Sequence, residues 1–116
     1  MTRLALALLA LLAACHTAPC RPPSGHVTAE RLTGCGEPTD AELAALLDDD
    51  GTPCLVRERA DAACETTLET ECIDADGVWE WRGTLTYDGD GYSGILARRE
   101  LRDGVLCSGE FRVEVR

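Results

Sequence analysis

Hydrophobic positions recur at a helical period in one short segment of the chain, between residues 39 and 47. The leucines on that face are Leu43, Leu46 and Leu47. Thr39 can cap the N-terminus of this segment, and Glu42 three residues later completes a capping box. We therefore expect one short helix, which ends at the acidic residues 48–50 because negative charge is unfavourable at a helix C-terminus.

From residue 65 onward, apolar and polar residues alternate with a period of two, which is typical of half-buried strands. Turns rich in Asp and Gly interrupt this pattern at residues 74–77, 88–91 and 102–104. The pattern predicts an antiparallel meander of three or four strands, covered on one face by the helix, in an α+β or mostly β domain. Residues 52–64 fit either a short helix or an extended segment. Residues 16–38, rich in Pro, Gly, Thr and Ser, are expected to be irregular.

An unbroken run of Leu and Ala occupies residues 4–14, directly after a short start that contains Arg3. The run is too short to span a bilayer, which takes about 20 apolar residues. Its length and its basic flank instead fit a signal peptide. We expect residues 1–14 to be removed on export.

The run ends in Leu12-Ala13-Ala14-Cys15, which resembles the lipobox of bacterial lipoproteins. The resemblance implies cleavage before Cys15, diacylglycerol on its thiol and an acyl chain such as palmitate on the new amino terminus. Several acyl chains anchor a protein stably, whereas one anchors it marginally. The absence of Asp after Cys15, where His16 stands, implies the outer membrane. The alternative is an ordinary secreted protein cut after Ala14.

The chain contains seven cysteines in 116 residues. Without Cys15 an even set remains, which in an exported chain predicts three disulfides. The six are Cys20, Cys35, Cys54, Cys64, Cys72 and Cys107. Their pairing stays open, and the absence of a Cys-x-x-Cys motif argues against zinc. The expected organisation is a lipidated Cys and tether over residues 15–38, followed by one small disulfide-rich domain over residues 39–116.

Charge restricts the possible partners of this chain. Asp and Glu number 21 against 11 basic residues, all of them Arg, for a formal net charge of −10. Such a surface repels nucleic acid and anionic lipid head groups. It leaves membrane attachment to the lipid on Cys15, and it admits cations, glycans or an envelope protein as partners.

Two groups of residues suggest binding chemistry. Asp74 and Asp76 in one turn, and Asp88 and Asp90 in another, have the spacing of oxygen ligands in calcium loops. The alternative is that Asp and Gly simply form hairpin turns. Trp79 and Trp81 project from the same face of one strand and can stack on sugar rings if exposed, or form the core if buried.

Catalysis has little support in this sequence. The histidines are His16 and His26, both in the segment expected to be irregular, and no serine is marked as a partner nucleophile. We predict that the chain is not an enzyme and needs no cofactor. The expected function is a non-catalytic binding or structural role in the cell envelope, and the alternative is a calcium- or carbohydrate-binding surface module.

The C-terminus is similar to that of small cysteine-rich lipoproteins of myxobacteria, a group that implies no particular activity. The residues that carry this similarity are Cys107, Ser108, Gly109, Phe111, Val113 and Arg116.

Overall fold

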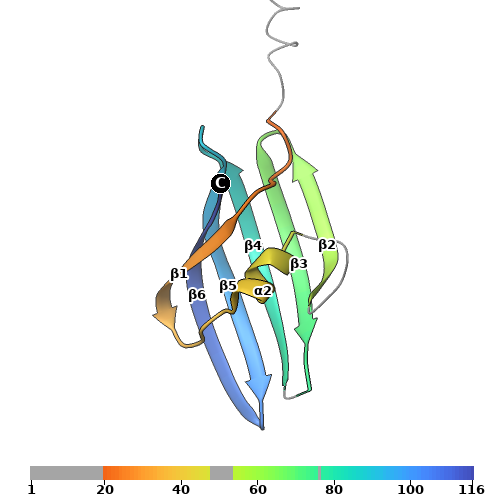
Figure 1. Cartoon of the computed structure of the whole chain (residues 1–116), viewed down its shortest axis with the longest axis vertical. Coiled ribbons are helices and arrows are strands. Elements are labelled where there is room, and N and C mark those ends of the chain that lie inside the picture. Colours follow the sequence, from red (N-terminus) through yellow and green to blue (C-terminus); the bar gives the residue numbers. More distant parts are fainter. Residues whose placement is uncertain (1–19, 48–53, 76) are drawn as a thin grey trace, which may run out of the picture.

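The computed structural model describes residues 20–47, 54–75 and 77–116, in which six antiparallel strands form one sheet. The strands are β1 (Val27–Gly34), β2 (Cys54–Ala62), β3 (Glu65–Ile73), β4 (Gly77–Tyr87), β5 (Tyr92–Arg102) and β6 (Val105–Val115). Their order across the sheet is β1-β6-β5-β4-β3-β2 (Figure 1). The last five strands therefore follow one another as a meander, which confirms the predicted mostly β fold.

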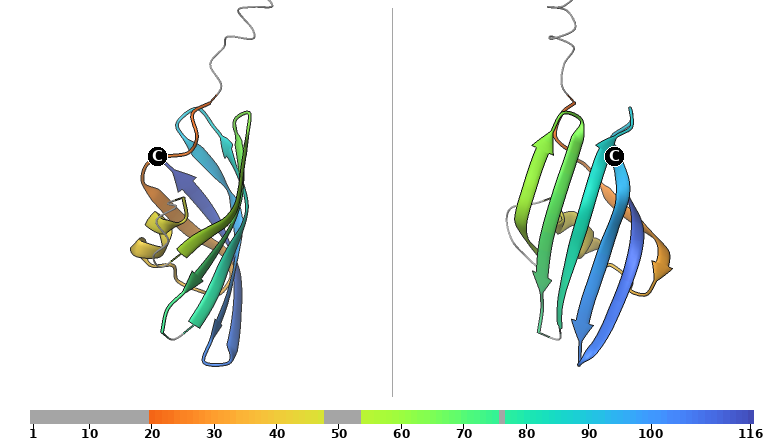
Figure 2. Two further views of the ribbon diagram at one scale, coloured as in Figure 1. Left: turned by 90° about the vertical axis from the view of Figure 1, so that its right-hand side faces the viewer. Right: turned by 180° about the vertical axis from the view of Figure 1, so that it is seen from behind.

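The helix α2 (Asp40–Ala45) lies against one face of this sheet, here called the inner face (Figure 2). Its start is the predicted one, because the backbone N–H of Glu42 donates to Oγ1 of Thr39 at 3.2 Å. The predicted end at residues 48–50 falls outside the described residues. No helix in the described part of the chain is long and apolar enough to cross a membrane.

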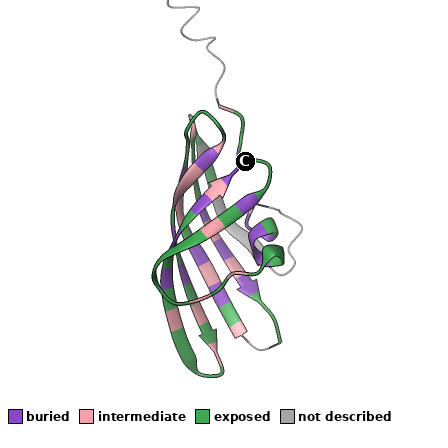
Figure 3. Ribbon diagram, turned by 60° about the vertical axis from the view of Figure 1, so that its left-hand side comes forward, coloured by how far each residue is buried: buried purple, intermediate pink, exposed green. Residues whose placement is uncertain are grey.

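The core fills the space between α2 and the inner face. Alternation along β3 to β6 points the bulky side chains to this side, as the burial pattern of β3 and β6 shows (Figure 3). Trp81 and Phe111 meet at its centre, with ring centroids 5.3 Å apart. Leu46, which directly follows α2, is 1% exposed and belongs to the same core as these two rings. A buried leucine of this kind stabilises the fold by roughly 1.5–3 kcal/mol.

The N-terminal segment differs from the prediction, because β1 forms within residues expected to be irregular. Its backbone pairs with β6 from Val27 opposite Val115 to Gly34 opposite Gly109. Most of its side chains are exposed, so the strand shows little of the alternation by which strands are recognised. Hydrogen bonds to the edge of β6, which the sequence pattern does not reveal, make this segment a strand.

Three disulfides connect the six cysteines, as their even number predicts. The pairs are Cys20–Cys64, Cys35–Cys107 and Cys54–Cys72. The last pair joins directly opposed residues of β2 and β3. β2 lies within residues 52–64, the segment for which the sequence left helix and strand open. The other two pairs tie both ends of the β1 region to the sheet.

The two ends of the sheet are distinct (Figure 1). Cys20 is bonded to Cys64 in the β2–β3 turn, and the β4–β5 turn lies at this same end. We call it the Cys20 end. The β3–β4 and β5–β6 turns lie at the opposite end, which we call the far end. Residues 1–19, with the predicted lipidation site Cys15, fall outside the described residues.

Candidate functional site

A row of exposed apolar side chains crosses the outer face of the sheet near its far end. Ile73, Val78, Leu101 and Leu106 are 65%, 42%, 53% and 58% exposed. They are consecutive partners in the ladders, since Ile73 opposes Val78, Val78 opposes Leu101, and Leu101 opposes Leu106. We call these four residues the apolar row. An unbroken row of this kind on a solvent-facing surface is typical of an interaction site.

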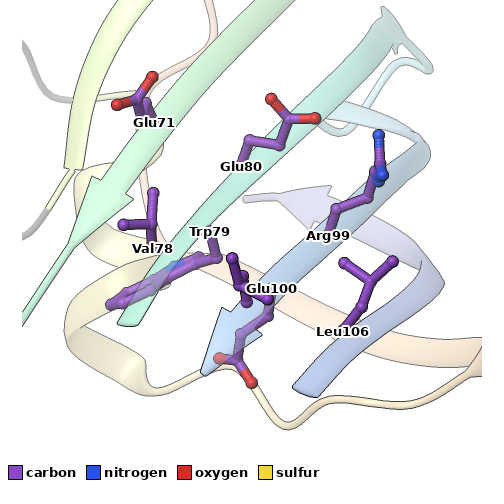
Figure 4. Close-up of a pocket in the computed structure, with 8 residues that line it drawn as sticks. Glu71, Val78, Trp79, Glu80, Arg99, Glu100 and Leu106 are labelled. Carbon is purple, nitrogen blue, oxygen red and sulfur yellow. The ribbon is translucent and has the colours of Figure 1, made fainter. Parts of the chain in front are cut away.

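A row of charged and polar residues lies beside the apolar row, one step toward the Cys20 end. Glu71, Glu80, Arg99 and Ser108 oppose one another in that order across β3, β4, β5 and β6. Six residues of the two rows line a shallow groove of about 310 Å³ (Figure 4), namely Glu71, Val78, Glu80, Arg99, Leu101 and Leu106. Glu80 contacts Arg82 only at 3.9 Å, and Arg99 has no ion pair among the described residues. The groove therefore offers apolar area beside the charges of Glu80 and Arg99.

No helix or strand of the described chain covers this outer face, because α2 and the N-terminal segment lie on the inner side (Figure 2). The groove side chains come from strand positions whose neighbours point into the core. Trp79, for example, is 5% exposed and points inward between the outward-facing Val78 and Glu80 (Figure 4). The core thereby fixes the positions of the groove residues.

The inner face contains a buried ion pair that the sequence did not indicate. Nε and Nη2 of Arg98 donate to the carboxylate of Glu42 at 2.9–3.2 Å, and Nη2 also donates to Glu100 at 2.9 Å. The side chains of Glu42 and Arg98 are 1% and 4% exposed. Burial raises the pKa of Glu42 above its ordinary value, although the hydrogen bonds and the charge of Arg98 act in the opposite direction.

This ion pair fixes α2 to the sheet. The guanidinium carbon of Arg98 lies 5.7 Å from the ring centroid of Trp79 and 5.8 Å from that of Trp81, so cation–π contacts add to the pair. Glu42 was expected only to complete a capping box; its carboxylate binds the sheet instead. Because the cluster is closed to solvent, we assign it a structural role.

The two tryptophans that were candidates for sugar stacking are core residues in position. Trp81 is 0% exposed and Trp79 is 5% exposed. Stacking on a sugar needs an exposed ring face, which neither ring has. Their buried positions agree with the core interpretation.

The acidic turns hold their aspartates in local contacts. Asp74 accepts from the backbone N–H of Gly77 at 2.8 Å and from Arg102 at 3.2 Å. Asp88 accepts from the backbone N–H of Asp90 at 3.1 Å and from Arg116 at 2.7 Å, and Arg116 holds the pKa of Asp88 well below its usual range. The two backbone contacts are those of hairpin turns, and each of these aspartates is also bound by an arginine outside its turn.

Calcium binding at these turns stays a prediction. Among the side chains that the structure describes, no three acidic, histidine or cysteine groups are placed to hold one metal ion. Asp76 is outside the described residues.

His26 begins the pairing of β1, since its backbone exchanges hydrogen bonds with Arg116, and His16 lies outside the described residues.

Sequence reasoning missed the apolar row as a site. Its signal was present, because Leu101 and Leu106 flank the β5–β6 turn and interrupt the polar positions of the outer face. The row becomes visible only when the strand register places these residues beside Val78 and Ile73.

The chain matches no protein-family model, and neither a curated protein nor a solved structure is significantly similar to it.

Proposed function

We propose that this chain is a lipid-anchored protein of the bacterial cell envelope that binds a protein partner, without catalysis, through the groove on its outer face. The observation that carries the binding role is the apolar row. Its four exposed apolar side chains lie side by side on neighbouring strands. Exposure of this apolar area to water is unfavourable, and a bound partner would remove it from water.

The anchor is supported by the lipobox-like Leu12-Ala13-Ala14-Cys15 and by the three disulfides, which form in oxidising compartments. A lipid on Cys15 would stand five residues before Cys20. Since Cys20 lies at one end of the sheet and the apolar row near the other, the groove would lie at the end that is distant from the membrane surface (Figure 1).

The anchor is tested by comparing the native protein with the Cys15→Ser variant in the producing cell. We expect the wild type in the membrane fraction, with an intact mass that begins at Cys15 and includes acyl chains. Cys15→Ser should lose the acyl mass and leave the membrane. A wild-type mass that begins after residue 14 without lipid would contradict the anchor.

The binding role is tested by removing the apolar row without disturbing the core. In Leu101→Ser/Leu106→Ser, complexes isolated from membranes by cross-linking should be lost. Ile95→Ser is the matched control, because Ile95 is also on the outer face of β5 and is 52% exposed, but it lies outside the groove. Equal cross-linking in all three proteins would show that the groove binds no protein.

A further inference from the structure

We propose that the partner of this groove is a second copy of the same chain, which packs outer face to outer face about a twofold axis parallel to the strands. This inference rests on the proposed function, since it names the partner of the proposed binding face. The observation behind it is that the two rows of the groove are complementary to themselves under that one operation.

The operation turns one copy about an axis that runs between β4 and β5. Each residue of β4 then faces its own ladder partner on β5 of the second copy, and β3 faces β6 in the same way. Val78 therefore faces Leu101 of the second copy, and Ile73 faces Leu106. Apolar residues meet apolar residues along the whole row, as an isologous interface requires.

The charged row obeys the same operation. Glu80 and Arg99 are ladder partners within one chain. Across the twofold axis, Glu80 of each copy therefore faces Arg99 of the other copy. Two reciprocal ion pairs result, between one copy's Glu80 and the second copy's Arg99 and the reverse. Glu71 faces Ser108, which is neutral. No like charges oppose one another in either row.

The next row limits the contact. Glu69, Arg82, Ala97 and Glu110 follow one another there, and the operation would place Glu69 against Glu110. The contact therefore ends after two rows. Two rows on four strands cover roughly 19 by 14 Å, or about 270 Å² per copy. A stable interface buries about 800 Å² per partner, so this dimer is weak and forms where the protein is concentrated.

Membrane anchoring would supply that concentration. Because the axis runs along the strands, both copies have their Cys20 ends on the same side, so both lipids could enter one membrane (Figure 1). A twofold axis across the strands would direct the two anchors to opposite sides. The apolar and charged rows together thus favour the arrangement that a single membrane permits.

The test uses the full lipidated chain in vesicles and measures energy transfer between labelled copies. The chain has no lysine, so Ser24→Lys, at an exposed position, gives one amine for dye attachment. We expect more transfer than for unassociated protein at equal surface density. Glu80→Arg alone and Arg99→Glu alone should each weaken association at least about tenfold, because like charges then oppose one another twice.

A mixture of the Glu80→Arg and Arg99→Glu proteins should restore transfer, because in the mixed dimer every pair is again of opposite charge. This rescue also excludes misfolding as the cause of the single effects. Arg112→Glu is the matched control, since Arg112 is an exposed arginine of the outer face beyond the groove, and it should leave transfer unchanged. Absence of rescue in the mixture would overturn the proposed dimer.

Vesicle flotation separates this proposal from the anchor. If the full chain does not float with vesicles, the anchor is wrong, and the same two variants and their mixture are compared by sedimentation at millimolar protein concentration. Rescue there supports the dimer without the anchor, and its absence overturns the dimer. In native membranes, a Leu101-dependent carbodiimide link to a lysine of another protein would also overturn it, because this chain has no lysine to link.

Discussion

The buried ion pair between Glu42 and Arg98 gives the sharpest stability prediction. Arg98→Met keeps a long side chain beside Trp79 and Trp81 but removes the charge that compensates Glu42. Removing one partner of a buried pair costs about 3–5 kcal/mol, because the other charge stays out of water. With side chains 1% and 4% exposed, this pair belongs to that class.

The loss should depend on pH in a defined direction. Arg98 provides the two largest influences that lower the pKa of Glu42, whereas burial and Glu100 raise it. In Arg98→Met the pKa of Glu42 therefore rises further above the ordinary value of 4.5. A raised folded-state pKa adds stability below the unfolded-state value, and this stability is lost as pH rises through the folded-state pKa, by up to about 1.4 kcal/mol per pH unit.

The assay is urea unfolding of the oxidised protein, followed by tryptophan fluorescence at pH 5 and pH 7.5. We expect Arg98→Met to be destabilised by about 3–5 kcal/mol at pH 7.5 and by less at pH 5. Arg82→Met is the control, because its pair with Glu69 has a similar distance of 3.0 Å but side chains that are 60% and 30% exposed. That variant should lose less than about 1 kcal/mol.

A double variant tests the cause. Glu42→Gln/Arg98→Met has no buried carboxylate, so its stability should not show the pH dependence of Arg98→Met. The reasoning would be refuted if Arg98→Met lost the same stability at both pH values, or no more than Arg82→Met at pH 7.5.

Three further predictions concern the turns and cross-links. Gly34→Ala should destabilise the fold more than Gly104→Ala in thermal unfolding, although the two glycines have similar φ angles of 75° and 77°. A Cβ at Gly34 would lie 2.0 Å from the Ser108 carbonyl oxygen, whereas a Cβ at Gly104 would face open space. Gly104→Ala should therefore lower the free energy of unfolding by only about 1–2 kcal/mol. Cys54→Ala/Cys72→Ala removes a cross-link with a sequence separation of 18 and should lower the free energy of unfolding by about 3 kcal/mol, with urea unfolding as the measurement. Asp88 should remain ionised when an NMR titration passes below pH 3.8, because Arg116 lowers its pKa. The stability that this carboxylate contributes is therefore present above that pH and lost as pH falls through the folded-state pKa. Arg116→Gln should move the pKa of Asp88 back toward the ordinary value of 3.8.

Local patterns in the sequence were sufficient for much of the fold. The alternation after residue 65 predicted three or four strands, and the structure has four there, β3 to β6, because a period of two persists wherever one face of a strand is buried. Thr39 and Glu42 located the start of α2, since capping is a local interaction. The even number of cysteines indicated three cross-links, although their pairing depends on which strands meet.

Tertiary contacts decided the remainder. β1 is a strand because its backbone forms hydrogen bonds with the edge of β6. Most of its side chains are exposed, so its sequence gives little indication of this pairing. The role of Glu42 depends on Arg98, which is 56 residues away in the chain. The outer-face groove exists because the register sets Ile73, Val78, Leu101 and Leu106 side by side. Periodicity shows which face of its own strand a residue occupies, but only the pairing of strands determines its neighbours across the sheet, and a binding surface consists of those neighbours.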